Sequence, residues 1–528
     1  MYDYVIVGAG SAGCVLAARL SEDPDVKVCL IEAGPADTSG NIHVPAGAAK
    51  LFRTELDWDY DSHTEPFCEG RRIYLPRGRV LGGTSSLNGM IYIRGNRRDY
   101  DSWSLPGWSH DELLPYFKRA EDNEWGASEY HGAGGPLAVS DGRSHNPMSE
   151  AFIKATAEAG YSHNPDFNGE TQDGFGYYQV TQRDGMRCSS AVAYLHPAMR
   201  RPNLTVETNV QVHRVTLSEG RATGIAGRRL EEDVEIRAER EVILAAGAYN
   251  SPQLLMLSGI GPAEQLGPLG IPVIVDQPLV GRNLQDHPQF WLVYAHSQPV
   301  SLLVAGEERY QRQYAEERSG PLASNGPEAG GFLRSSEDLA QPDLQFTSLP
   351  VMFADGGLGF PTAHALSYGG YVLQPRSRGS VTLGSDDPTA KPRISHNYYA
   401  DDTDLTTATA GVRAALDFAR QTALAPYTEK PYSVPASDSD ADIRDFLRRN
   451  TQTSYHAAGS CAMGKVTDGE LRVLGVDGLR VVDASVMPTL ISGNTNAPTI
   501  AIAEKAADLI RDVAPLPRDA VAAAAHHS

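Results

Sequence analysis

The sequence predicts an α/β fold, α+β overall, in which a lobe with a parallel sheet is joined to a second lobe built on a mostly antiparallel sheet. Three observations support this prediction. The chain has 528 residues, which is enough for two or more lobes. Its first residues alternate between apolar runs typical of buried strands and a helical segment, as in parallel sheets. Residues 343–400 instead alternate apolar and polar side chains, which favours antiparallel strands with one face in water.

Residues 2–34 have the pattern of a Rossmann-like βαβ unit. The apolar run "YVIV" predicts a buried strand that ends in glycines with the spacing G-x-G-x-x-G, namely Gly8, Gly10 and Gly13. These glycines allow a tight turn and let a pyrophosphate approach the N-terminus of the next helix, which we predict over 11–20. A second apolar strand ends at Glu32, whose carboxylate can accept hydrogen bonds from an adenosine ribose. NAD and FAD both fit this unit.

Later segments return to the same sheet. Residues 204–217 predict a further strand, and the run "EVILAAGA" within 240–261 predicts a buried strand that is followed by a helix. We therefore divide the chain into a nucleotide-binding domain in three parts (1–145, 201–285 and 451–515), a linker with a segment of the second lobe (146–200), a substrate-binding domain (286–450) and a tail (516–528).

The composition excludes several classes of protein. A hydrophobic content of 41% with 21% charged residues is typical of a globular protein, and a net charge of −20 argues against nucleic acid as a partner. No apolar run approaches the roughly 20 residues that span a bilayer. Five scattered cysteines without a C-x-x-C pair, and a first strand that begins at once without a signal-like segment, predict a cytoplasmic protein. No zinc helix, phosphate-binding P-loop or G-x-S-x-G elbow is present, so we expect no metal site and no hydrolase chemistry.

A second glycine-rich segment, "GRVLGGTSSLNGM", accompanies the first. Small residues let backbone amides approach an extended ligand, and Asn88 can bond a heteroatom; the segment also carries Gly82, Gly83 and Thr84. A surface turn is the alternative for this segment taken alone. Beside the N-terminal glycines, it predicts a cofactor long enough to touch two loops.

The C-terminal region places a histidine among small residues. In "TSYHAAGSCAMG" the neighbours of His456 leave room for a ligand, and Asn494 precedes a predicted helix. Histidine can take a proton near neutral pH, because its unperturbed pKa is about 6.5. The alternative is a hydrogen-bonded histidine of the core.

Ordered signatures run along the whole chain: "RGRVLGGTSSLNG", "GAYNSPQLLMLSGIGP" at 247–262, "NLQDHP" at 283–288, "QPRSRGSVTLGS" at 374–385, "LRVVDASVMP" at 479–488, "YHAAGSCAMG" and "GNTNAPT". With these motifs the chain resembles the glucose–methanol–choline (GMC) family of FAD-dependent oxidoreductases from residue 2 to about residue 512. The resemblance implies that the cofactor is FAD and that it stays bound.

The resemblance also implies roles for individual residues. His456 matches the active-site histidine of the family and Asn494 its second His-or-Asn position. The residues expected to bind the cofactor are Gly8, Gly10, Ser11, Ala12, Gly13, Glu32, Gly82, Gly83, Thr84, Asn88, Met90, Val212, Asp483 and Asn496.

The implied reaction is the oxidation of an alcohol. His456 takes the hydroxyl proton, Asn494 holds the oxygen, and a hydride passes from the carbinol carbon to the flavin. A helix that we expect to begin near Pro498 presents its positive end to the flavin. Oxygen or a quinone-type carrier is the expected acceptor. Two alternatives remain open: a redox-neutral offshoot of the family, such as a lyase or decarboxylase, and a non-catalytic flavin-binding protein.

Departures from the family pattern narrow the substrate. Leu87 stands where some relatives tether FAD through a histidine, so we expect non-covalent FAD. Gln289 stands where choline-oxidising relatives have a glutamate, and Ala48 falls near an aromatic position of their cage. Thr347 matches a polar pocket position and predicts a modest hydrogen bond. We therefore expect a neutral primary alcohol, benzylic, furanic or aliphatic, rather than choline.

Overall fold

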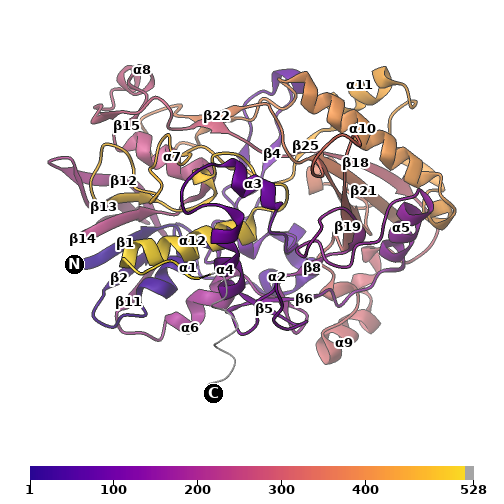
Figure 1. Ribbon diagram of the computed structural model, residues 1–528, viewed down its shortest axis with the longest axis horizontal. Coiled ribbons are helices and arrows are strands. Elements are labelled where there is room, and N and C mark those ends of the chain that lie inside the picture. Colours follow the sequence, from indigo (N-terminus) through magenta and orange to yellow (C-terminus); the bar gives the residue numbers. More distant parts are fainter. Residues whose placement is uncertain (518–528) are drawn as a thin grey trace.

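The computed structural model describes residues 1–517 of the chain, and the last eleven residues of the predicted tail, 518–528, lie outside the described part. Two seven-stranded sheets organise the molecule and lie side by side, with the N-terminal strand in the sheet at the left of Figure 1. One sheet has a parallel core and the other is antiparallel. The predicted α/β fold, α+β overall, is confirmed.

The first sheet carries the predicted βαβ unit at its centre. Its strand order is β11-β2-β1-β14-β13-β12, and β26 pairs with β14. The strands β11, β2, β1, β14 and β26 run parallel, and the hairpin β12–β13 continues the sheet in antiparallel fashion. The bounds are β1 Tyr2–Val7, β2 Val28–Ile31, β11 Leu204–Glu207, β12 Val210–Ser218, β13 Arg221–Arg229, β14 Glu232–Leu244 and β26 Leu479–Val481.

The run 204–217, which we predicted as one strand, is two strands at opposite edges of this sheet. β11 pairs with β2, whereas β12 pairs with β13. Asn209 between them has φ 56°, a left-handed conformation that ends the first strand. Both pieces contain β-branched residues, so the composition of the run does not reveal the break.

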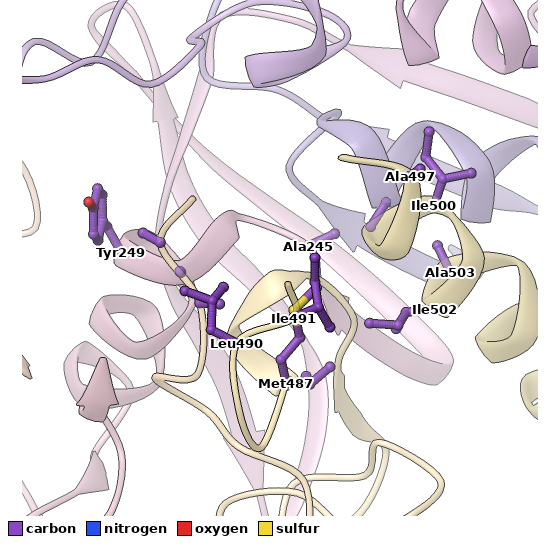
Figure 2. Packing of buried hydrophobic residues seen from close by; sticks show 14 of the residues in the cluster. Ala245, Tyr249, Met487, Leu490, Ile491, Ala497, Ile500, Ile502 and Ala503 are labelled. Carbon is purple, nitrogen blue, oxygen red and sulfur yellow. The ribbon is translucent and has the colours of Figure 1, made fainter. Parts of the chain in front are cut away.

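Helices α1 (Ser11–Leu20) and α4 (His110–Ala120) each pack against α12 (Asn496–Arg511) on this lobe, and α7 (Gly247–Leu257) follows β14. Small and apolar residues let the helices approach closely. Figure 2 shows Ala497, Ile500 and Ala503 of α12 in the core, with Leu490 and Ile491 of the preceding segment nearby. This packing fixes both the start of α12 and the segment before it.

The second sheet is antiparallel throughout, with the strand order β24-β18-β21-β20-β19-β7 and β25 on β18. The bounds are β7 Gly174–Tyr177, β18 Pro288–Ala295, β19 Ala329–Leu333, β20 Leu344–Leu349, β21 Ala365–Val372, β24 Lys430–Ser433 and β25 Gln452–Thr453.

The prediction that one face of this sheet is exposed to water is wrong. Every residue of β19 and β21 is buried. Helices α5 (Pro147–Glu158) and α10 (Asp402–Ala419) cover one face, at the right of Figure 1. Residues of the other face line a cavity. The more strictly alternating segments 379–382 and 393–395 form a separate small sheet with residues 282–284.

The remaining elements are short. Their bounds are α2 Gly40–His43, α3 Arg97–Ser102, α6 His196–Ala198, α8 Ala263–Leu266, α9 Glu308–Glu317, α11 Asp440–Asn450, β3 Tyr60–Asp61, β4 Tyr74–Leu75, β5 Glu121–Asn123, β6 Leu137–Asp141, β8 Gln179–Val180, β9 Gln182–Arg183, β10 Met186–Arg187, β15 Ile260–Gly261, β16 Val275–Asp276, β17 Arg282–Leu284, β22 Gly379–Thr382 and β23 Arg393–Ser395. Among residues 1–517, none of the helices combines the length and apolar character needed to cross a bilayer.

Candidate active site

A cavity of about 1260 Å³ is lined by residues of both sheets. Sixteen residues that we predicted from the sequence line it: Gly8, Gly10, Ser11, Ala12, Glu32, Gly83, Thr84, Asn88, Met90, Val212, Gln289, Thr347, His456, Asp483, Asn494 and Asn496. Two predicted residues, Gly13 and Gly82, do not line it. The structure therefore brings together residues that lie almost 500 positions apart in the sequence.

The two predicted glycine-rich loops meet at the cavity. Gly82 N donates a hydrogen bond to Ala9 O at 2.8 Å. A Cβ atom on Gly83 would lie 2.6 Å from the Cα of Gly10, and one on Gly13 would lie 1.8 Å from Gly8 O. Gly13 and Gly82 therefore act behind the cavity wall, where they allow the close contacts that shape it. The backbone cradle fits an extended dinucleotide.

Two helix N-termini also reach the cavity. Helix α1 begins at Ser11 and α12 at Asn496, two residues before the start near Pro498 that we expected. Ser11 Oγ donates to Asn496 Oδ1 at 2.7 Å and joins the two ends. Unpaired N–H groups and the helix dipole make such ends favourable for anions. The cavity thus offers two sites that suit negative charge, as FAD requires.

Two buried carboxylates follow strands of the parallel sheet. Glu32 accepts hydrogen bonds from the backbone N–H groups of Ala9 and Gly34, both at 2.9 Å, and burial raises its pKa to about 7. Asp483 accepts from Ser251 Oγ at 2.5 Å and from Gly247 N at 2.9 Å, and burial raises its pKa as well. Such oriented acceptors fit the hydroxyl groups of a dinucleotide.

Asn88 is held by a residue that sequence reasoning missed. Its Oδ1 accepts from Arg187 Nη1 at 2.8 Å and from Met90 N at 3.1 Å, which leaves its Nδ2 donors for a ligand in the cavity. Arg187 is buried, and burial lowers its pKa to about 9. Among residues 1–517, no carboxylate forms an ion pair with Arg187.

His456 and Asn494 are in contact. Asn494 Nδ2 lies 3.1 Å from His456 Nε2. On the other side of the ring, His456 Nδ1 lies 3.0 Å from Nδ1 of a second buried histidine, His287. His287 Nε2 in turn lies 3.0 Å from Leu373 O and 3.1 Å from Ile491 O.

These contacts determine which nitrogen carries each proton. Burial lowers the pKa of His287 to about 4 and holds the pKa of His456 well below its usual value, so both rings are neutral near pH 7. His287 Nε2 faces two carbonyl oxygens and must donate, which leaves its Nδ1 as an acceptor. His456 Nδ1 must then donate to it. His456 Nε2 therefore keeps its lone pair, which is the form that a proton acceptor needs.

A glutamine extends this directed chain. Gln345 Nε2 donates to Asn494 Oδ1 at 3.0 Å, so the Nδ2 of Asn494 points to His456. A hydroxyl group that enters between the two side chains would meet one acceptor, His456 Nε2, and one donor, Asn494 Nδ2. Such a pair can take the proton of a hydroxyl group and hold its oxygen.

The antiparallel sheet forms the opposite wall. Gln289, on β18, and Thr347, on β20, are both buried and line the cavity. Gln289 stands opposite Tyr371 of β21, whose ring stacks on His287 with centroids 5.4 Å apart. Leu87, which offers no nucleophile, also lines the cavity. The structure thus places both predicted pocket residues on the wall beside the histidines.

Three residues that support the site were missed by sequence reasoning: Arg187, His287 and Gln345. None lines the cavity; each orients a residue that does. His287 lies within the signature "NLQDHP", which was a usable signal, and Gln345 lies two residues before Thr347 on the same strand. We find no sequence signal for Arg187.

Comparisons with known proteins agree with this geometry. Family models described as GMC oxidoreductase match residues 2–289 and 375–503. The chain is 43% identical to mitochondrial choline dehydrogenase of Homo sapiens, with 97% of this chain and 90% of that protein covered. It is 42% identical to an alcohol dehydrogenase (acceptor) of Pseudomonas putida, with 97% and 96% covered. Pyridoxine 4-oxidase from Mesorbium loti has a similar crystal structure, with a TM-score of 0.89, 33% identity, and 97% of this chain and 100% of that chain covered.

Proposed function

We propose, from the premise that this chain belongs to the GMC oxidoreductase family, that it oxidises a neutral primary alcohol to the aldehyde. The chain is an FAD-dependent oxidoreductase that acts on alcohols. Our proposal concerns the charge of the substrate, the roles of the residues, the mode of FAD binding and the electron acceptor.

FAD, when bound, supplies the two-electron acceptor for the carbinol carbon. In our proposal His456 Nε2 accepts the hydroxyl proton, and Asn494 Nδ2 holds the oxygen as its negative charge develops. His287 keeps the ring of His456 in the tautomer that can accept that proton. The N-terminus of α12 favours negative charge on the cofactor side.

One observation favours a neutral substrate. Of the described residues that line the cavity, three are acidic: Glu32, Asp57 and Asp483. Glu32 and Asp483 belong to the glycine-loop end, and Asp57 accepts hydrogen bonds from the Tyr74 hydroxyl and from the backbone N–H groups of Arg53 and Arg77. A cationic alcohol at the Gln289 wall would thus lose its hydration without gaining a counter-charge, which is costly. This favours benzylic, furanic or aliphatic alcohols over choline.

Three further points complete the proposal. FAD is held without a covalent bond, because Leu87 offers no nucleophile. Oxygen or a quinone-type carrier reoxidises the flavin. The protein works in the cytoplasm, a proposal supported by five cysteines that are all buried and unpaired.

Anaerobic flavin reduction tests the function. The purified yellow protein is mixed with benzylic, furanic and aliphatic alcohols and with choline, the flavin absorbance is followed, and air is then admitted. We expect neutral alcohols to bleach the flavin and to exceed choline in kcat/KM. A flavin that stays oxidised with every alcohol would favour a redox-neutral or non-catalytic protein instead. A separate sample, denatured in acid, should release FAD into the supernatant if the cofactor is not covalently bound.

A further inference from the structure

Three cavity-lining residues of the antiparallel wall, Trp291, Thr347 and Tyr371, have a buried polar group without a protein partner. The hydroxyl of Thr347 and the indole N–H of Trp291 are both buried, and neither forms a hydrogen bond with the protein. Both residues line the cavity. An unpaired buried donor is costly, and the cost is recovered when a ligand supplies the acceptor. Trp291 is also held in place, because its ring packs on Phe353 with centroids 4.9 Å apart.

The strand register places these groups together. Trp291 of β18 and Thr347 of β20 are both paired with Gly369 of the strand between them, β21. Paired residues of neighbouring strands point to the same face of a sheet. Because glycine has no side chain, Gly369 places no side chain between Trp291 and Thr347. A ligand group in the cavity between Trp291 and Thr347 has a hydrogen-bonding residue on either side.

The same strand register shows how far Trp291 and Thr347 lie from the row of residues next to His456 and Asn494. Gln289, Tyr371 and Gln345 form the next row on this face, and Gln345 is bonded to Asn494. Residues i and i+2 of a strand are separated by about 6.7 Å. Trp291 and Thr347 therefore lie about that far along the wall from the row that contains Gln345, the residue bonded to Asn494.

We infer that the substrate carries, besides its carbinol group, a hydrogen-bond acceptor at its far end, and that Trp291 and Thr347 bind it. This inference rests on the proposed function. The indole N–H can only donate, so the far group must contain an acceptor atom, whereas the Thr347 hydroxyl can donate or accept. The spacing suits a flat ring with substituents at opposite ends. The substrate class is thus a hydroxymethyl arene or heteroarene with an oxygen or nitrogen acceptor across the ring.

Two alcohols of nearly equal shape test this. We compare kcat/KM for 4-methoxybenzyl alcohol, which has an acceptor, with that for 4-ethylbenzyl alcohol, which has none. We expect the native enzyme to prefer the methoxy compound by about 10- to 100-fold, because the ethyl group leaves both donors unpaired. The preference should lie mainly in KM, since the contact is remote from the reacting carbon.

The methoxy group also changes the electronic properties of the ring, but this effect is the same in every variant. A difference in preference between the native enzyme and a variant therefore reports the hydrogen bonds alone. Thr347→Val is isosteric and Trp291→Phe keeps an aromatic ring; each should reduce the preference by at least about 3-fold, and the double variant by about 10-fold or more. Ser348→Ala is the matched control. Ser348 also has an unpaired buried hydroxyl, but it points to the opposite face and does not line the cavity. The Ser348→Ala variant should prefer the methoxy compound as strongly as the native enzyme does.

The outcomes separate the two proposals. Benzyl alcohols that reduce the flavin with the same preference in the native enzyme, the single variants and the double variant would overturn this inference and leave the proposed function intact. Inhibition by the two product aldehydes gives a second measure without turnover, and equal inhibition constants in the native enzyme would contradict the inference as well. No reduction by any alcohol would overturn the proposed function itself.

Discussion

The two ends of the cavity are built in different ways. At the end of the parallel sheet, backbone groups, glycines and two helix N-termini form the surface. At the end of the antiparallel sheet, side chains from three neighbouring strands form it: Gln289, Trp291, Thr347 and Tyr371. At Gly8, Gly13 and Gly83 of the first end, an added Cβ would meet backbone atoms, so these positions do not tolerate a side chain. Because exchange of a side chain can change the surface of the second end, we propose that specificity resides there.

The largest effect is expected at the first end. In Gly13→Val the new Cβ would lie 1.8 Å from Gly8 O, so the helix and strand must separate. We expect a loss of at least about 3 kcal/mol in unfolding free energy and no retained FAD. Gly142→Val is the control, because a Cβ there has no neighbour within 4 Å; it should change stability by less than about 1 kcal/mol. FAD content and thermal unfolding measure both, and a Gly13→Val holoprotein would contradict the assignment of the loop.

The difference between the ends also explains what the sequence predicts. Gly8, Gly10, Gly13 and Glu32 lie within one short segment, and their spacing is dictated by local backbone geometry, so the pattern is visible in the sequence. The position of Trp291 beside Thr347 depends instead on the register of three strands, which no local pattern specifies.

Supporting residues are hidden for a second reason. Arg187 and Asn88, or Gln345 and Asn494, lie about 100 or more positions apart and meet only in the folded chain. His287 lies within a recognisable signature, yet its role depends on the backbone carbonyl oxygens of Leu373 and Ile491. Because every residue has a backbone carbonyl, the sequence does not reveal these two partners. The sequence thus predicts the groups that line the cavity better than the groups that orient them.

A smaller effect is expected behind the wall. In His287→Gln the longer side chain places its amide near the position of Nε2, so the acceptor for His456 Nδ1 is lost. The tautomer of His456 with its proton on Nε2 then becomes populated. We expect anaerobic flavin reduction to slow by about 10- to 100-fold. In His287→Asn the side-chain oxygen can replace Nδ1 as the acceptor, so the rate should recover to within about 10-fold of native. Nitrogen-15 chemical shifts of His456 report the tautomer directly. Equal rates in both variants, with a native tautomer, would show that His287 serves packing alone.

The smallest effect is expected at the second end, where one charge changes. Gln289 is buried and lines the cavity, so Gln289→Glu adds a carboxylate for a cationic alcohol. We expect the ratio of kcat/KM for choline to that for benzyl alcohol to rise by about 10-fold, with Gln289→Leu as a matched control that shows no rise. Steady-state kinetics with both substrates measure this ratio. An unchanged ratio in Gln289→Glu would mean that position 289 does not contact the substrate.

The central claim is that His456 Nε2 accepts the proton of the alcohol. Stopped-flow reduction of the flavin in the His456→Ala holoprotein, without oxygen and over a range of pH, tests it most directly. Because burial lowers the pKa of His456, the native rate should be constant above about pH 6.5 and fall only in more acidic solution, where the imidazole becomes protonated. The variant should bind FAD, reduce it about 10²- to 10⁴-fold more slowly and lose that acidic fall. A folded His456→Ala protein that reduces its flavin at a near-native rate, with the same pH profile, would contradict the account.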